Sequence, residues 1–163
     1  MKFVMVRVDN RLVHGQILEG WLPALRASSI IVVNDDVAAD LFRESVIKMA
    51  VPSDIDVSVY SVMDFVQSYE NGDQVVQRAI VLFKDIDDVL LAYRSGFHYE
   101  RVNIGNVHDD DGICCVSPAT VLNRGDVEKL RELISHGVVV EVQCVPRDKS
   151  VNFQEIADDL ETG

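Results

Sequence analysis

Residues 2–33 read KFVMVRVDNRLVHGQILEGWLPALRASSIIVV and contain a complete strand–loop–helix–strand pattern. The apolar run at residues 2–8 predicts a strand, and after a polar loop the amphipathic stretch at about 15–26 predicts a helix. The apolar run at 29–33 predicts the next strand. A helix between two apolar strands is typical of parallel strands that a helical crossover connects.

The same alternation continues along the rest of the chain. Further strands are predicted at 55–60, 79–83, 101–104, 113–117 and 138–145, and helices at 36–50, from Ser61, at 85–94, at 125–136 and in the tail from Asn152. Asp36 is the predicted cap of the 36–50 helix, and Gly137 is the predicted left-handed residue that ends the 125–136 helix. Strands so rich in Val and Ile predict a sheet buried on both faces. We therefore expect an open, doubly wound α/β fold with a mostly parallel sheet of about seven strands and helices on both faces.

Length and charge exclude several classes of protein. With 163 residues the chain predicts a single domain over 1–163, with its core at 2–151 and a C-terminal tail or short helix at 152–163. The 15 Lys and Arg residues against 27 acidic ones give a net charge of −12, which repels nucleic acids and anionic lipid. No apolar run reaches the length of about 18 residues that a membrane span needs, and no secretory signal is recognisable. We expect a cytoplasmic protein with no nucleic-acid partner and no direct membrane insertion.

The loop after the first predicted strand carries residues that suit an anion. Arg7 and Arg11 offer forked donors that match phosphate oxygens. Gly15 opens a predicted helix whose N-terminus has free N–H groups, and it leaves room for a bound group beside the backbone. His14 is a competent nucleophile toward phosphorus when its ring is neutral. From these residues alone, a histidine that merely packs or lies on the surface remains the more common alternative.

The segment VRVDNRLVHGQ at residues 6–16 resembles the active-site segment of a known protein family. This family is the IIB component of the mannose–fructose–sorbose group of the bacterial phosphoenolpyruvate-dependent sugar phosphotransferase system. Similar segments continue along about residues 2–151: IIVVNDDVAAD at 30–40, KMA at 48–50, VNIGNVH at 102–108, DVEKLREL at 126–133 and GVVVEVQCVP at 137–146.

The resemblance implies that the chain is a phosphocarrier. His14 would accept a phosphoryl group on Nδ1 from the phosphohistidine of a IIA partner and pass it to a sugar that the membrane components IIC and IID translocate. Members use no metal and no organic cofactor. The chain would then be cytoplasmic and peripheral at the inner face of the membrane through IIC and IID. The family's loop residues correspond to Asp9, Arg11, Gly15 and Gln16 here.

Phosphoryl transfer between two histidines depends mainly on positioning and charge stabilisation. We expect Arg11, together with Arg7, to neutralise the equatorial oxygens of the transferred group. The helix start at Gly15 and Gln16 would add backbone donors. For Asp9 there are two interpretations, a salt bridge that orients Arg11 or a cap on the first helix, and we favour the salt bridge.

Other residues at the carboxyl ends of predicted strands are further candidates for the same site. Asn34 and Asp35 are candidate phosphate or partner contacts, although a turn with a helix cap is their more common role. Lys84 follows another predicted strand and is a candidate contact as well. Gly105 is expected to serve a tight turn. His108 beside the acidic run 109–111 is the best metal candidate, with a solvated turn as the more common alternative.

Two other functions compete with the phosphocarrier. A regulatory module would accept phosphate on His14 and report its phosphorylation state without feeding a transporter, and it would need the same loop. A nucleotide-binding domain could use the same helix start, but the chain contains neither G-x-G-x-x-G nor G-x-x-x-x-G-K-[ST]. Gly20 and Pro23, which weaken a helix, predict that the first helix is short or kinked.

Overall fold

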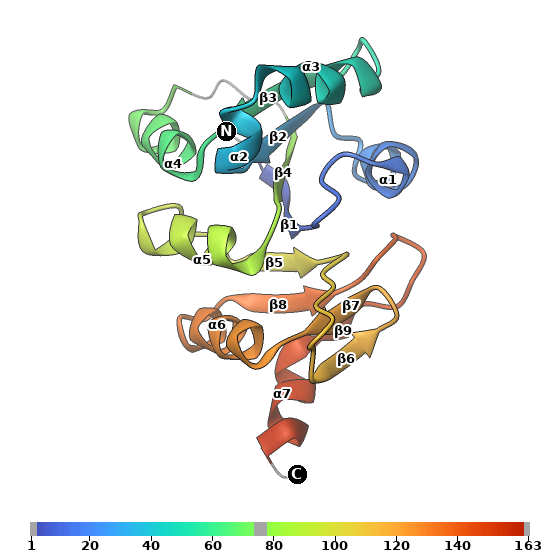
Figure 1. The fold of residues 1–163 in the computed structure, drawn as a ribbon, viewed down its shortest axis with the longest axis vertical. Coiled ribbons are helices and arrows are strands. Elements are labelled where there is room, and N and C mark those ends of the chain that lie inside the picture. Colours follow the sequence, from blue (N-terminus) through green and yellow to red (C-terminus); the bar gives the residue numbers. More distant parts are fainter. Residues whose placement is uncertain (1–2, 74–77, 162–163) are drawn as a thin grey trace.

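The computed structural model describes residues 3–73 and 78–161, and its main feature is a seven-stranded sheet (Figure 1). The order of strands across the sheet is β3-β2-β4-β1-β5-β8-β9. Their bounds are β1 Phe3–Val8, β2 Ser29–Val33, β3 Asp56–Tyr60, β4 Ala79–Phe83, β5 Arg101–Ile104, β8 Val139–Val142 and β9 Val151–Asn152. All neighbours pair in parallel except β8 and β9, which are antiparallel. This confirms the predicted fold class, while Lys2 of the first predicted strand lies outside the described residues.

Helices cover both faces of this sheet. Their bounds are η1 Gln16–Trp21 (a π-helix), α1 Leu22–Leu25, α2 Asp35–Ala38, α3 Leu41–Ala50, α4 Val62–Asn71, α5 Ile86–Arg94, α6 Arg124–Ser135 and α7 Phe153–Glu161. Figure 1 shows α4, α5 and α6 on one side of the sheet and α1 on the other, with α2 and α3 near one end. Ser61 and Asp85, where two of the predicted helices begin, each accept a hydrogen bond from the backbone N–H three residues ahead and so cap α4 and α5. Gly137 has φ +88° and ends α6, as predicted.

Two apolar cores result, one on each face of the sheet. The larger core joins α4, α5, α6 and α7 to the sheet, and its largest fully buried side chains include Phe65, Phe83, Phe97 and Phe153. The smaller core joins η1, α1 and α2 to the opposite face through Ile17, Trp21, Leu22 and Val37. Strands β2 and β4 face both cores and are buried at every position. Their continuous apolar sequence therefore follows from their central place in the sheet.

The structure corrects two predicted elements and confirms a third. The predicted helix at 36–50 is two helices, because Asn34 caps α2 and Asp40 caps α3, so Asp36 is not the cap. The predicted strand at 113–117 corresponds to β6 (Cys114–Ser117), which lies outside the main sheet and pairs with β7 (Thr120–Leu122) in an antiparallel hairpin. The first helix is a π-helical turn followed by one short α-helical turn, so it is short, as Gly20 and Pro23 predicted.

Candidate functional site

The site lies where β1, β4 and β5 end together at the carboxyl edge of the sheet. Val8 is in register with Phe83 of β4 and with Ile104 of β5. Backbone hydrogen bonds continue past the strand ends, since the Asp9 N–H donates to the Phe83 carbonyl at 2.9 Å. The Asn10 N–H likewise donates to the Asn106 carbonyl at 2.8 Å. The β1–η1 loop, residues 9–15, is thereby held against the loop that follows β5.

Asp9 is the centre of the hydrogen-bond network in this loop. Its side chain is fully buried, and its Oδ2 atom lies 2.9 Å from His14 Nε2 and 3.0 Å from Asn106 Nδ2. The same oxygen accepts from Arg7, with Nη2 at 3.1 Å, while Oδ1 accepts from the Arg11 backbone N–H at 3.0 Å. Burial raises the pKa of Asp9, but the hydrogen bond from His14, the charge of Arg7 and the hydrogen bond from Asn106 outweigh it, so the pKa lies below its usual value. Asp9 is therefore a buried carboxylate that organises its neighbours.

Both interpretations of Asp9 are wrong. Its carboxylate contacts the backbone of Arg11, not the guanidinium, because the salt bridge goes to Arg7 instead. It does not cap the first helix either, since Gly15 occupies the N-cap position with no side-chain cap. Neighbouring residues 7 and 9 lie on the same side of the extended backbone, which makes Arg7 the nearer partner.

Arg7 is a structural residue and not the predicted phosphate ligand. It is fully buried, and its five N–H donors make five hydrogen bonds: two to Asp9, one to Asn103 Oδ1, and one each to the carbonyls of Gln143 and Cys144. The guanidinium carbon also lies 5.3 Å from the ring centre of Trp21. Burial lowers the pKa of Arg7, and the charge of Asp9 opposes this shift. No donor remains for a phosphoryl group.

Gly105 provides the room that Arg7 needs. A Cβ atom on Gly105 would overlap the guanidinium group of Arg7, with its Nε only 2.8 Å away. The Gly105 carbonyl accepts a 2.6 Å hydrogen bond from the buried Thr120 hydroxyl, so this backbone cannot easily move. Gly105 is thus needed for close packing against Arg7, which differs from the tight turn that the sequence predicted.

His14 stands at the end of the loop, directly before the helix. Its Nε2 faces Asp9, so the ring donates Nε2–H to the carboxylate and leaves Nδ1 as the free nitrogen. The side chain keeps 8% of its surface exposed. Leu12 in the same loop has φ +54°, a conformation that costs a residue with a side chain about 1 kcal/mol or more. Burial of that side chain beneath the loop offsets the cost.

Arg11 and Gly15 lie on the outer side of this loop. Arg11 is exposed, and its guanidinium has no hydrogen-bond or ion-pair partner among residues 3–73 and 78–159. A Cβ atom placed on Gly15 would meet nothing within 4 Å, so the space beside His14 is open. Gln16 contributes differently, because its Oε1 accepts from Asn106 Nδ2 at 2.8 Å. That contact joins the first helical turn to the carboxylate network.

Asn34, Asp35 and Lys84 lie outside this network. Asn34 caps α2 by accepting from the Val37 N–H, and Asp35 accepts from the Val62 N–H at 2.9 Å. Their side chains therefore have the capping role that we gave as the more common one. Lys84 follows β4, is half-buried, and has no hydrogen bond or ion pair in the part of the chain that the structure describes. Its contact with a phosphoryl group or partner stays a prediction.

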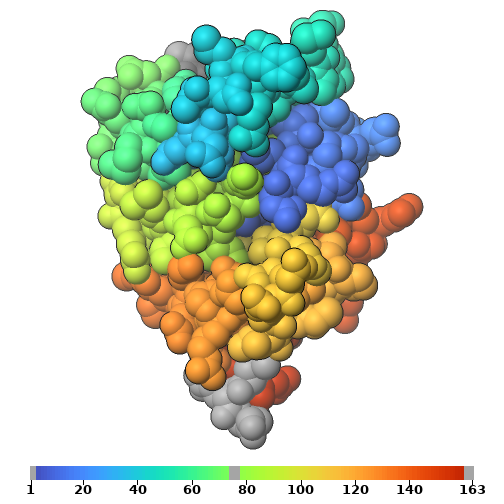
Figure 2. All heavy atoms as spheres, viewed as in Figure 1, coloured from blue at the N-terminus to red at the C-terminus, as the bar shows by residue number. Residues whose placement is uncertain are grey.

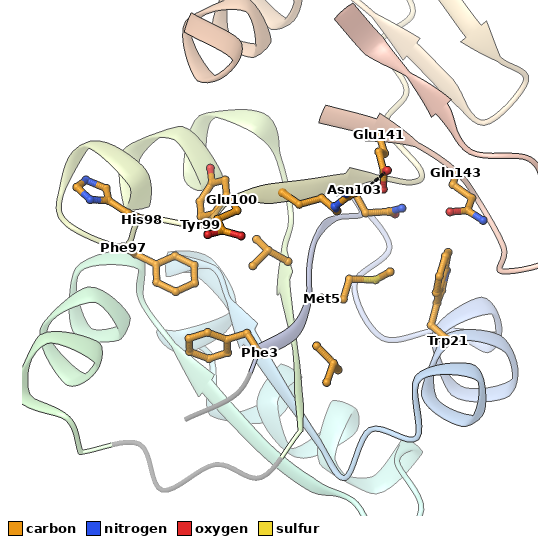
Figure 3. A pocket seen from close by; sticks show the side chains of 13 residues that line it. Phe3, Met5, Trp21, Phe97, His98, Tyr99, Glu100, Asn103, Glu141 and Gln143 are labelled. Atoms are coloured by element: carbon orange, nitrogen blue, oxygen red, sulfur yellow. Dashed lines mark hydrogen bonds and ion pairs between the residues drawn. The ribbon is translucent and has the colours of Figure 1, made fainter. Parts of the chain in front are cut away.

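A cavity lies away from this loop, on the face of the sheet beside β1, β5 and β8 (Figure 3). It has a volume of about 520 Å³, and Met5, Trp21, Asn103, Glu141 and Gln143 are among its lining residues. Asn103 Oδ1 and the Gln143 carbonyl accept hydrogen bonds from Arg7 on this side. The cavity is therefore lined by residues that hold Arg7, and His14 is not among its lining residues. Within the described residues, no three His, Cys, Asp or Glu side chains are grouped closely enough to hold a metal ion.

Comparison with known proteins decides the family. The model of the sorbose subfamily of phosphotransferase-system IIB components matches residues 3–162. The chain belongs to this family. The sorbose-specific EIIB component of Klebsiella pneumoniae is 33% identical over 153 residues, which cover 94% of this chain and 93% of that protein. The crystal structure of the IIBSor domain of the sorbose permease from that organism has a TM-score of 0.87 at 32% identity, covering 99% of this chain and 98% of the domain.

Other relatives of this IIB component differ in the sugar for which they are named and in their length. The fructose-specific EIIB component of Bacillus subtilis (strain 168) is 29% identical, with 96% of each chain covered. The mannose-specific EIIAB component of Escherichia coli (strain K12) is 28% identical over 157 residues, but these residues cover only 49% of that longer protein. The IIB family takes part in phosphotransfer during sugar uptake, and the EIIAB protein joins a IIA component and a IIB component in one chain. Among residues 3–73 and 78–161, no helix of this IIB chain has the length and apolar character of a membrane span.

Sequence reasoning missed residues that hold the site together. Asn106 donates to both Asp9 and Gln16, and Trp21 packs on Arg7 while its Nε1–H donates to the Cys144 carbonyl at 3.0 Å. One signal was present for Asn106, because it follows a predicted strand at the same sheet edge as the loop. For Trp21 no local pattern exists, since Arg7 lies 14 positions and Cys144 123 positions away along the chain.

Proposed function

We propose that this IIB chain accepts a phosphoryl group on Nδ1 of His14 from the phosphohistidine of a IIA protein. The His14 Nε2 to Asp9 Oδ2 contact of 2.9 Å carries this proposal. The lone pair of Nδ1 attacks the phosphorus, the N–P bond of the donor breaks, and its electron pair returns to the donor imidazole. The ring of His14 becomes cationic as the new bond forms. The buried Asp9 carboxylate, held ionised, stabilises that charge.

The surroundings of the free nitrogen support the same step. The unpaired guanidinium of Arg11 is available to neutralise the oxygens of the transferred group. The open space at Gly15 leaves room for that group, and the start of η1 adds partial positive charge. Arg11 is therefore proposed as the catalytic cation and Arg7 as the residue that positions Asp9.

The phosphoryl group then passes to a sugar that IIC and IID translocate, and the chain works in the cytoplasm, docked on these membrane components during the second step. The relatives that are named for sorbose, fructose and mannose support a sugar as the final acceptor. The −12 charge of the chain supports docking through protein contacts, because anionic lipid would repel it.

Intact-protein mass tests the proposal directly. The chain is incubated with phosphoenolpyruvate, the general phosphotransferase proteins and a cognate IIA protein. We expect one added, acid-labile phosphoryl group, absent in His14→Gln and present in His108→Gln, whose ring is exposed outside the site. Coupling between ¹⁵N and ³¹P by NMR identifies the nitrogen, and a phosphoryl group on Nε2 would contradict the orientation argued here. Phosphoryl loss upon adding sugar and membranes that contain IIC and IID separates the carrier from a regulatory module, which keeps its phosphoryl group.

A further inference from the structure

We propose that the outer face of α3, with the groove between α3 and the β1–η1 loop, is the docking surface for the phosphohistidine protein that phosphorylates His14. This inference rests on the proposed function of His14. The α3 surface is defined by Leu41, Phe42, Arg43, Val46 and Met49. The partner that binds this surface is a protein whose phosphohistidine is surrounded by apolar side chains.

The helix α3 presents large apolar side chains to solvent. Leu41 is 79% exposed, Phe42 77% and Met49 85%, and the helix has no buried residue at all within its ten positions. Phe42, Val46 and Met49 are spaced four and three apart, so they share one side of the helix. The helix is held to the smaller core by Ile47 on another side. An apolar face that contributes nothing to the core is typical of a protein-binding surface.

This face continues into the loop that carries His14. A groove of about 270 Å³ runs between them, with Arg11 and Leu12 on the loop side and Phe42 and Val46 on the helix side. In Figure 2 the cyan to teal atoms of the α2–α3 segment adjoin the blue atoms of the N-terminal segment. A protein seated on α3 therefore lies next to the loop, as transfer between two histidine rings requires.

The charges of the groove suit a partner that brings an anion. Arg11 and Arg43 both line it, and neither guanidinium has a partner within the described residues. The nearest acids on α3 are occupied, because Glu44 is paired with Lys48 at 2.6 Å and Asp40 caps the helix. Two free cations in a chain of net charge −12 mark this place as the approach for a negatively charged group.

The same charges disfavour two other partners for this surface, a second copy of the chain and the membrane-bound components that hold the sugar. A second copy docked through this face would bring its own Arg11 and Arg43 against those of the first copy, with repulsion between like charges. The membrane-bound acceptor presents a neutral sugar hydroxyl, which does not need two arginines beside the entry path. The donor is the partner that arrives with the phosphoryl charge already in place.

The test compares the α3 surface with an exposed apolar residue elsewhere. Phosphorylation of His14 is followed by intact mass at increasing concentrations of phosphorylated IIA for the unaltered chain, F42S/M49S, R43E and the control M63S, since Met63 on α4 is 55% exposed. For F42S/M49S and R43E we expect the KM for phosphorylated IIA to rise about tenfold, with kcat nearly unchanged. M63S should retain the KM of the unaltered chain.

Each outcome of this test is informative. If the unaltered chain gains no phosphoryl group at any donor concentration, the proposed function itself is wrong. If all variants are phosphorylated with the KM of M63S, the function stands and the docking surface is wrong. The inference is also overturned if the α3 variants slow only sugar-dependent dephosphorylation in membranes with IIC and IID, or if they change only the oligomeric state by light scattering. Circular dichroism spectra confirm that the compared variants are equally folded.

Discussion

The Nε2 atom of His14 lies 2.9 Å from Oδ2 of Asp9, and this contact determines which ring nitrogen is free to react. The same oxygen accepts from the buried Arg7, so the ring is oriented by a carboxylate that is itself held from behind. Both positions are fixed where β1 ends between β4 and β5. The sheet thus supports the ring of His14 through two layers of charge and hydrogen bonds.

Replacing Asp9 by Asn removes the charge that orients His14 and leaves Arg7 buried without its counterion. We expect Asp9→Asn to slow phosphorylation of His14 by about 100-fold and to lower the free energy of unfolding by about 3 kcal/mol. Stopped-flow transfer from phosphorylated IIA and urea unfolding measure the two effects. Asp54→Asn, at an exposed position, changes the net charge equally and should alter neither. Normal transfer by Asp9→Asn would show that the contact does not orient the ring.

Arg7 of β1 and Arg11 of the loop should respond differently to the same substitution. Arg7→Lys removes most of five buried hydrogen bonds, so we expect it to lose about 3 kcal/mol of unfolding free energy. Arg11→Lys should change stability by less than about 0.5 kcal/mol because the side chain is exposed, yet slow phosphoryl transfer about tenfold at saturating donor. Chemical denaturation and single-turnover kinetics on both variants check the contrast. Equal stability of the two variants would contradict the structural role of Arg7.

Gly105 and Gly15 form a matched pair of glycine-to-alanine tests. The Cβ of Gly105→Ala would overlap the Arg7 guanidinium, so we expect a loss of about 2 kcal/mol or more in unfolding free energy, with displaced Asp9 and slower transfer. Gly15→Ala meets open space and has helical φ, so its stability should stay the same or rise slightly. Thermal unfolding followed by circular dichroism compares them, and a stable, fully active Gly105→Ala protein would rule out the tight fit described above.

Asp88 should make stability depend on pH. Burial and the neighbouring Asp85 raise its pKa to about 6, against the Asn34 hydrogen bond, with Asp35 and Asp87 adding to the rise. The folded chain then binds its proton more tightly than the unfolded chain, so stability falls as the pH rises from about 4 through 6. We expect Asp88→Asn to be more stable than the unaltered chain at pH 8, by up to about 1 kcal/mol after solvent screening, and equal to it near pH 4.

Urea unfolding at pH 4, 6 and 8 measures this difference. Asp54→Asn serves again as the exposed control, with no such change expected between pH 4 and 8. A constant difference between Asp88→Asn and the unaltered chain at all three pH values would mean that Asp88 titrates as an ordinary carboxyl group.

Most of the fold was predictable from local patterns. The apolar runs that became β2 and β4 are buried at every position, so their sequences carry an unmixed signal for central strands. The errors occur where the pattern is weak. Residues 36–50 contain no Gly or Pro to show that the chain breaks between α2 and α3, and the break is decided by the Asp40 cap. The strand β6 has the composition of a sheet strand, but its partner is β7 in a separate hairpin.

For the site, the sequence by itself indicated His14 as the candidate acceptor, together with two arginines and the helix start, because these residues are close together along the chain. It did not determine their roles. Arg7 is buried, Arg11 is exposed and Asp9 contacts Arg7 and His14. Their partners Asn103 and Asn106 lie in β5 and in the loop after it, 96 and 97 positions along the chain from Arg7 and Asp9. A hydrogen bond needs its donor and acceptor atoms about 3 Å apart, so such partners must be placed to within a fraction of an ångström. Only the packed sheet sets these distances, so the tertiary structure decided which nitrogen of His14 is free.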